Sequence, residues 1–575
     1  MLRYMGLAGA SLIWLAACGE PEAERVADAP ETSAPQAAAN AANGGDWPYH
    51  QDTSPQMTEA DFAYRISTLA DDRFMGRAPG HEIGETAADW IAEEMRRAGL
   101  EPAGEDGGWF QNVPLIESTL DEAVSDLDIT VNGEAMGLRM GQDVVFWTQQ
   151  PVDAVAIEPS DMVFVGYGVV APEFGWNDYA GLDVTGKTVV ILVNDPGYAR
   201  PDSGLFNGSA MTYYGRWTYK YEEAARQGAA GAIIVHQTEP ASYGWATVRN
   251  SWSGPQFILA SAADEPFVDV EGWIQLEIAE QLFEAAGLNF AALAEAAAEP
   301  GFTPVPLEGA QMTASLQNDL RTLSSRNVAG RVRGSERPDE HVLFMAHWDH
   351  LGERLNFASD DNIYNGAVDN ASGTAFILEL AEAFAADEPP ARSLIFVAVT
   401  AEEQGLLGSA YYAQNPLVPL NQTVGGFNFD AILPVGETEN VVVIGYGASQ
   451  MEDMLREEAE ARGRYLSPDP TPEAGFFYRS DHVSMARRGV PMLYAKGGNV
   501  HVEFGEAHGA AIANAYRTLH YHQPSDEYDD SWDLSGFVQD GELFYALSRR
   551  LADSDEWPNW YEGNEFRGLR DAMMD

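Results

Sequence analysis

The sequence predicts an α/β protein with a mostly parallel sheet covered by helices on both faces, and a β-rich domain inserted ahead of it. After about Asn327, short apolar runs alternate with segments of helical period, the pattern of parallel sheets. Between about 131 and 300, short apolar runs are instead bounded by glycines, as in β-rich domains. At 575 residues the chain is also too long for one ordinary core.

Changes in composition divide the chain into five predicted segments. They are an export signal (1–18), a flexible tether (19–55), a first part of the main domain (56–130), the insert (131–300) and the rest of the main domain (301–560).

The first segment has the features of a bacterial export signal. Arg3 precedes an apolar stretch too short to span a bilayer comfortably, and small residues lead to Cys18, the single cysteine. Leu15 to Cys18 resembles the lipobox of bacterial lipoproteins, which implies that Cys18 is lipidated and becomes the first residue of the mature chain. The alternative is an ordinary signal peptide with a chance cysteine. We therefore expect an exported lipoprotein on a bacterial membrane, with Gly19 favouring the outer membrane, facing the periplasm or the exterior.

The acidic composition limits the partners. The formal net charge is −56, from 89 acidic against 33 basic residues spread along the chain. Such a surface repels phosphates and anionic lipids, so we expect no nucleic acid partner and membrane contact only through the lipid anchor. The tether is rich in Ala, Pro, Glu and Asn without apolar periodicity, which predicts disorder.

Two helices and an intervening loop are predicted in the segment 56–130. Thr58 resembles a helix cap, followed by apolar residues at helical spacing, and a second helix is predicted over 84–98, ended by Gly99. The residues 72–77 between them are expected to form an exposed loop.

The periodicity also places strands and helices in the two larger domains. In the insert, strands are predicted over 163–168, 187–192 and 232–235, and a helix over 222–228. In the main domain, strands are predicted over 341–346, 394–399, 424–429, 441–444 and 491–494, and helices over 373–385, 450–462 and 482–488.

Polar residues of the kinds that bind metals follow the predicted strands of the main domain. Ligands of open α/β sheets bind beyond the carboxyl ends of the strands. Each such residue alone is weak evidence, but two histidines and three carboxylates together match what a pair of zinc ions sharing one bridging carboxylate needs. The residues at these positions are His347 and Asp349, Asp369, Glu402 and Glu403, Asp430, and His522 near the carboxyl end.

Four motifs in this set resemble the co-catalytic zinc aminopeptidase family. They are Ala-His-Trp-Asp-His at 346–350, the run 365–373, Thr-Ala-Glu-Glu-Gln-Gly at 400–405, and Tyr-His-Gln-Pro-Ser-Asp at 521–526. That family includes bacterial leucyl aminopeptidases, with glutamate carboxypeptidase, glutaminyl cyclase and the transferrin receptor as relatives. The resemblance covers nearly the whole mature chain and implies the zinc exopeptidase fold, two Zn²⁺ ions, and an insert of the protease-associated type.

The resemblance also implies a role for each residue. His347 and Asp430 would bind one zinc, Glu403 and His522 the other, and Asp369 would bridge both. Glu402 would be the general base. Asp349 would hydrogen-bond His347 and fix its tautomer.

Several neighbouring residues receive other interpretations. His350 and His520 lie outside the motif's ligand positions and are interpreted as structural; on a strand, His520 and His522 would face the same way. Asp526 either orients His522 or lies in an exposed turn. The run 480–482 (Ser-Asp-His) is interpreted as packing and pocket shaping. The chain contains no HExxH, GxSxG, GxGxxG or Walker pattern.

The predicted substrates are peptides with a free amino end, shortened one residue at a time. The four carboxylates at the predicted zinc ions roughly neutralise them, so the site suits an amine better than a second carboxylate. Three alternatives remain: a cyclase-like acyltransferase with one zinc, a non-enzymatic binding protein, and a carboxypeptidase. The carboxypeptidase would need a basic patch near the metals, which the sequence does not locate.

Overall fold

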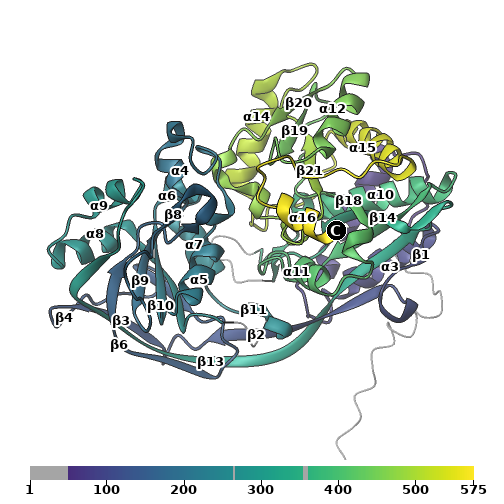
Figure 1. Cartoon of the computed structure of the whole chain (residues 1–575). Coiled ribbons are helices and arrows are strands. Elements are labelled where there is room, and N and C mark those ends of the chain that lie inside the picture. The colour runs from purple at the N-terminus through teal and green to yellow at the C-terminus, as the bar shows by residue number, and fades with distance from the viewer. Residues whose placement is uncertain (1–49, 263–265, 354–360) are drawn as a thin grey trace, which may run out of the picture. The chain divides into compact units, whose positions relative to one another are not determined.

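The main domain is built on a sheet whose central strands are parallel (Figure 1). In the computed structural model, β14 (Arg337–His347) lies between β17 (Arg392–Val399) and β18 (Thr423–Asn428), parallel to both. β21 (Met492–Gly497) continues the parallel order beyond β18. β19 (Asn440–Ile444) then runs antiparallel to β21, and β20 (Tyr465–Pro468) pairs in parallel with β19. The predicted mostly parallel α/β sheet is confirmed, with β19 and β20 reversed at one edge.

The structure describes residues 50–262, 266–353 and 361–575. The predicted export signal, Cys18 and most of the tether lie outside these residues and stay predictions. Within the described part of the chain, no helix is long and apolar enough to cross a membrane.

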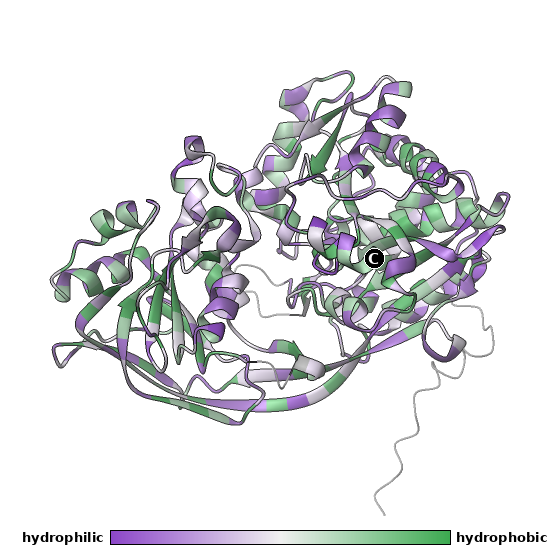
Figure 2. Ribbon diagram, viewed as in Figure 1, coloured by the Kyte–Doolittle hydropathy of each residue, from purple (hydrophilic) through white to green (hydrophobic). Residues whose placement is uncertain are grey.

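Alternate side chains of the central strands pack on opposite faces of this sheet, which is why helices cover both. In β14, Val342 and Phe344 join the core on one face, and Leu343 and Met345 join the core on the other. Figure 2 shows these strands as largely hydrophobic. The first face is covered by α2 (Glu59–Leu69), α3 (Thr86–Arg97), α10 (Ser372–Ala386), α12 (Met451–Ala461) and α15 (Ser535–Asp553), and the second by α11 (Leu407–Gln414) and α13 (His482–Ala486).

The two early helices form as predicted. The side chain of Thr58 caps α2 by accepting a hydrogen bond from the backbone N–H of Asp61. Shortly after α3, Gly99 adopts a φ of 92°, a left-handed conformation that glycine favours.

The segment between these helices is not the exposed loop that the sequence predicts. It forms the 3₁₀ helix η1 (Asp72–Arg77), in which Phe74, Gly76 and Arg77 are buried. Gly76 has a φ of 67°, and a Cβ there would lie 2.6 Å from the carbonyl oxygens of Gly352 and Tyr364. The charged composition of this segment predicts exposure. Burial is possible because backbone carbonyls, rather than water, accept the hydrogen bonds of the Arg77 guanidinium.

A second sheet occupies the predicted insert, in the strand order β5–β12–β10–β9–β6–β13–β3–β4. Its centre, from β12 to β6, is parallel. Apolar cores line both faces, with α8 (Leu276–Ala285) and α9 (Phe290–Ala297) on one and α5 (Trp217–Arg226) on the other. The strands are β3 (Asp126–Val131), β4 (Glu134–Ala135), β5 (Val144–Trp147), β6 (Ala154–Phe164), β9 (Thr188–Leu192), β10 (Gly231–His236) and β12 (Val270–Gln275). Its identity as a protease-associated domain stays a prediction.

One long strand belongs to both sheets. β13 (Val305–Val332) first pairs with β6 and β3 in the insert, then with β2 (Phe110–Leu120), and finally with β17 in the main sheet. Its 28 residues therefore connect the insert to the main sheet without an intervening loop.

Candidate metal centre

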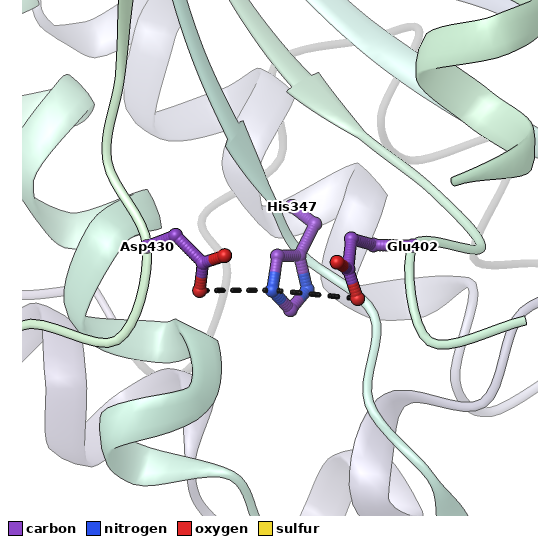
Figure 3. Close-up of side chains that lie close together, drawn as sticks. All are labelled: His347, Glu402 and Asp430. Atoms are coloured by element: carbon purple, nitrogen blue, oxygen red, sulfur yellow. Dashed lines mark ion pairs between the residues drawn. The ribbon is translucent and has the colours of Figure 1, made fainter. Parts of the chain in front are cut away.

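The predicted site residues of the main domain meet where its parallel strands end. His347 is the last residue of β14, Glu402 and Glu403 follow β17, and Asp430 follows β18. Because these strands are neighbours and parallel, their carboxyl ends bring the side chains to one edge of the sheet. Figure 3 shows His347 between Glu402 and Asp430. The Nε2 atom of His347 lies 3.5 Å from Asp430 Oδ1 and 4.0 Å from Glu402 Oε2.

Asp369 lies between this cluster and a second one. Its Oδ1 atom is 3.3 Å from His347 Nε2, and its Oδ2 atom is 3.3 Å from His522 Nε2. The same nitrogen of His522 lies 3.1 Å from Glu403 Oε2. Each histidine thus faces one oxygen of Asp369 and a further carboxylate of its own, the arrangement expected of a bridging ligand.

The donor atoms fit a pair of divalent cations. His347 Nδ1 makes its hydrogen bond to the backbone oxygen of Asp349 at 3.2 Å, while its buried Nε2 has no hydrogen-bond partner among the described residues. A buried nitrogen left open among carboxylates costs free energy unless something positive satisfies it. Two groups of ligand atoms lie close enough to hold a metal ion each: His347 with Glu402 and Asp430, and His350 with Asp369 and Glu403. Imidazole and carboxylate are ligands that zinc prefers.

His350 lies beside the predicted ligands Glu403 and Asp369, although the sequence interpretation treats it as structural. It is fully buried, and its Nδ1 atom lies 2.6 Å from Glu403 Oε1, the oxygen that does not face His522. The second histidine of the His-Trp-Asp-His run was the available signal, since it follows the same strand end as His347.

Asp349 supports the site, but not through the predicted hydrogen bond between its carboxylate and the ring of His347. Its Oδ1 atom is 3.9 Å from His347 Nδ1, too far for a hydrogen bond, and instead accepts one from the backbone N–H of Glu402 at 3.1 Å. Its carboxyl group therefore positions the loop that carries Glu402, while its backbone oxygen orients His347. Burial raises the pKa of Asp349 to about 7.

Asp526 holds the backbone of Asp369 rather than the ring of His522. Its carboxylate accepts hydrogen bonds from the N–H groups of Val368 and Asp369, at 2.9 and 3.1 Å, and from the Tyr516 hydroxyl at 3.1 Å. At 2% exposure it is not an exposed turn residue.

The segment before His522 is helical rather than a strand. A π-helical turn spans Tyr516–His520, and His522 follows with a φ of 56°. His520 is half-buried, hydrogen-bonds Ser525, and belongs to neither group of metal-binding side chains found among the described residues.

The run 480–482 is buried beside the metal centre. Asp481 is fully buried, and neither of its carboxylate oxygens has a hydrogen-bond partner in the described structure. Burial raises the pKa of Asp481 to about 7, and nearby His347 opposes this rise. The predicted packing role therefore understates its electrostatic connection to the site.

The adjacent glutamates experience opposite electrostatic environments. Burial raises the pKa of Glu402 well above its usual range, and Glu403, Asp481 and Asp430 raise it further. Burial also acts to raise the pKa of Glu403, but His522 and His350 outweigh it and hold the value at about 2. A carboxylate with high proton affinity thus stands beside one that stays ionised, a division of roles common in active sites.

A buried arginine that the sequence interpretation missed joins the loops of this centre. Arg77, 1% exposed, donates to four backbone carbonyls: Trp348 at 2.7 Å, Leu69 and Asn365 at 2.6 Å, and Gly366 at 3.0 Å. Trp348 follows His347, and the pair at 365–366 precedes Asp369, so one guanidinium connects both ligand loops. Burial lowers the pKa of Arg77 to about 10, still far above neutrality.

The fold and the site together define a class: an α/β protein with two adjacent carboxylate–histidine metal sites at the carboxyl ends of its parallel strands. Residues 327–545 match the model of peptidase family M28.

Similarity to individual proteins covers smaller parts of the sequence. A probable zinc metalloprotease of Pyrenophora teres f. teres is 35% identical over 130 residues, 21% of this chain and 26% of that protein. Aminopeptidase NAALADL1 of Mus musculus is 34% identical over 140 residues, 23% of this chain and 17% of that one. The matches thus span about a quarter or less of these relatives.

A solved structure supports the fold over most of the chain. The aminopeptidase from Aneurinibacillus sp. strain AM-1 superposes with a TM-score of 0.50 at 20% identity, covering 87% of this chain and 96% of that one.

Proposed function

We propose that this protein is a two-zinc exopeptidase that removes residues from the amino ends of peptides. The observation that carries the proposal is the position of Asp369, with one oxygen 3.3 Å from each of the two histidines. The predicted ligands are His347 and Asp430 for one ion, Glu403 and His522 for the other, and Asp369 for both. The family M28 match over 327–545 supports peptide-bond hydrolysis.

Glu402 is the proposed general base. When bound, the zinc pair supplies Lewis acidity that polarises the scissile carbonyl and makes water a better nucleophile. The Glu402 carboxylate, whose Oε2 atom lies 4.0 Å from His347 Nε2, takes a proton from the attacking water and delivers it to the leaving amine. Asp349 holds the backbone N–H of Glu402 and so keeps this carboxylate at the cluster.

The charge of the site supports an amine as the end of the substrate that it recognises. Glu402, Glu403, Asp369 and Asp430 roughly balance the charge of two zinc ions, and Asp349 and Asp481 add buried carboxyl groups nearby. A free amino group is stabilised in such surroundings, whereas an unpaired carboxylate there would lose its solvation.

The test is the digestion of one peptide with a free or an acetylated amino end, followed by mass spectrometry. We expect stepwise loss of amino-terminal residues from the free peptide and none from the acetylated one. Efficient trimming of the acetylated peptide from its carboxyl end would contradict the aminopeptidase proposal and favour a carboxypeptidase.

We also propose that the protein is an exported lipoprotein anchored through Cys18. The support is the sequence alone: Leu-Ala-Ala precedes the single cysteine at the end of an apolar stretch. Mass spectrometry of the mature protein should show a lipidated Cys18 as its first residue, and Cys18→Ala should abolish the modification. A mature chain that starts elsewhere and carries no lipid would refute the anchor.

A further inference from the structure

The turn that carries Glu402 has an unfavourable backbone conformation. It connects β17 to α11, and two of its non-glycine residues lie in the left-handed region: Ala401, directly before Glu402, has a φ of 53°, and Leu406 has a φ of 62°. The carbonyl of Glu402 accepts hydrogen bonds from the N–H groups of Gly405 and Leu406, at 2.9 and 2.8 Å. Such conformations persist only where the surrounding structure enforces them, so the contacts that hold this turn matter for the placement of Glu402.

The side chain of Asn327, on β13, contacts both ends of the turn. Its Oδ1 atom accepts a hydrogen bond at 3.0 Å from the backbone N–H of Thr400, two residues before Glu402. Its Nδ2 atom donates to the carbonyl of Gly408, in the first turn of α11, at 2.9 Å. The N–H of Gly408 in turn donates to the carbonyl of Thr400 at 3.0 Å. One fully buried amide thus fixes where the turn begins relative to where it ends.

This close approach of Asn327 depends on the glycine at position 408. A Cβ atom there would lie 2.6 Å from Asn327 Oδ1 and 2.1 Å from the carbonyl oxygen of Thr400. Both distances are too short for a real Cβ, so any larger residue would displace the amide or the turn.

A neighbouring glutamine sets the orientation of the Asn327 amide. Gln111, which is opposite Asn327 on β2 and also buried, donates from Nε2 to the carbonyl of Asn415 at 2.6 Å. Its Oε1 atom therefore faces Asn327 and accepts a hydrogen bond from Nδ2 at 3.0 Å. The Oδ1 atom of Asn327 is left to face the N–H of Thr400, which needs an acceptor.

The hydroxyl of Thr400 is held from the same strand. It lies 2.5 Å from the hydroxyl of Ser325, which itself donates to Glu85, so Thr400 is the donor in this pair. Ser325 and Asn327 are two residues apart on β13 and therefore lie on the same face of the strand. Both the backbone and the side chain of Thr400 are thus fixed by β13.

We propose that Asn327 is a positioning residue for Glu402. It does not act on the substrate; it holds the turn so that the Glu402 carboxylate stays at the metal centre, while Asp349 holds the N–H of Glu402 itself. The inference rests on the proposed function, in which Glu402 is the general base. A displacement of about 1 Å in a catalytic arrangement can cost about 10²-fold in rate, so loss of Asn327 should lower kcat rather than raise KM.

A double-mutant cycle tests this inference. Asn327→Ala, Glu402→Gln and the double variant are loaded with zinc, checked by elemental analysis, and assayed on leucine p-nitroanilide. Asn327→Ala should bind two zinc ions, lower kcat about 10- to 10²-fold and change KM less than about twofold. In the Glu402→Gln protein, the same substitution should change kcat less than about twofold, because a base that is already absent cannot be misplaced.

Two further variants separate positioning from general stability. Asn440→Ala is the matched control: Asn440 is a buried asparagine on β19 that donates to the Ser467 hydroxyl at 2.7 Å and accepts from the N–H of Val500 at 3.0 Å. It should lower the melting temperature as Asn327→Ala does, but leave kcat near the native value. If Asn327→Ala does not fold, the cycle is run with Asn327→Asp, which has the same size and keeps the acceptor for Thr400 but cannot donate to Gly408 as a carboxylate.

Three outcomes would overturn the inference while leaving the proposed function intact. The first is an equal fold-loss of kcat from the Asn327 substitution with and without Glu402. The second is the same loss of kcat in Asn440→Ala. The third is an Asn327 variant that cannot be filled with two zinc ions, which would assign Asn327 to metal binding instead. A near-native kcat of Glu402→Gln with both zinc ions bound would refute the proposed role of Glu402 and the inference with it.

Discussion

Replacing Arg77 by lysine should loosen both metal sites at once. The guanidinium donates to carbonyls at Trp348, Asn365 and Gly366, which flank the predicted ligands, and to Leu69 at the end of α2. Lysine keeps the positive charge but offers three N–H donors from a single atom, so at least one of the four hydrogen bonds is lost.

The size of the effect follows from those bonds. A hydrogen bond to a charged group contributes about 1.5–3 kcal/mol, so Arg77→Lys should lower the free energy of unfolding by about that amount. Arg77→Met would leave the carbonyls of Trp348, Leu69 and Asn365 unpaired, while that of Gly366 keeps the N–H of Ala371, at a cost of about 3–9 kcal/mol, comparable with the whole stability of a domain. The lysine variant is therefore the informative one, since it should still fold. Residues that orient metal ligands typically contribute ten- to hundredfold in metal affinity, and we expect about that loss.

The assay is zinc competition with a chromophoric chelator, together with the melting temperature of the zinc-loaded protein. Because both ligand loops share the guanidinium, the two zinc affinities should fall together. Arg73→Lys is the matched control: Arg73 lies in the same short helix, its side chain is 31% exposed, and it pairs with Asp71. An Arg77→Lys protein that binds both zinc ions with native affinity and melts at the native temperature would refute this reasoning.

Three further predictions test the site and the insert. Glu402→Gln should keep both zinc ions but lower kcat at least about 10²-fold, and a near-normal rate with both metals bound would reject Glu402 as the base. Asp369→Asn should weaken both zinc sites and His522→Ala mainly one; elemental analysis showing one tightly held zinc in the native protein would favour the cyclase-like alternative. Burial raises the pKa of Glu271 in the insert to about 8, so the folded state retains a proton that the unfolded chain releases at lower pH. Stability should therefore fall by up to about 1.4 kcal/mol per pH unit as the pH rises from the ordinary carboxyl range to about 8. Glu271→Gln, which still offers Gln149 an acceptor, should melt at a higher temperature than the native protein at pH 9 and at nearly the same temperature at pH 4. An equal difference in melting temperature at both pH values would contradict the raised pKa of Glu271 as the cause.

The main sheet was predictable because each strand is a short apolar run bounded by turns. The expected strands over 341–346 and 394–399 lie within β14 and β17, and the expected helix over 373–385 lies within α10. The direction of β19 was not predictable, since an apolar run of five residues carries no information about the orientation of its neighbour.

The residues that support the site were harder to identify than those expected to bind metal. His347, Asp369 and Glu403 lie in motifs at strand ends, where their residue types alone suggest ligands. Arg77 and Asp526 instead act through backbone groups distant in sequence, and a backbone carbonyl or N–H leaves no trace in the residue pattern. Polar residues outside regular periodicity are usually exposed, so Arg77 was expected at the surface, and Asp526 either there or at the ring of His522; tertiary hydrogen bonds place both elsewhere.

The balance of buried charge explains why such support is needed. Seven carboxyl groups lie at or beside the metal centre. All are buried or nearly so, and no side chain among them is more than 12% exposed. They are Asp349, Asp369, Glu402, Glu403, Asp430, Asp481 and Asp526. Arg77 is a buried arginine within electrostatic range of four of them, and its charge is directed into backbone carbonyls rather than into a carboxylate. The ligand loops are thus fixed by Arg77 and Asp526 through the backbone, which leaves the carboxylate oxygens free for cations. Metal binding then satisfies charges that the fold alone leaves uncompensated, so the same ions that would activate water should also stabilise the folded main domain.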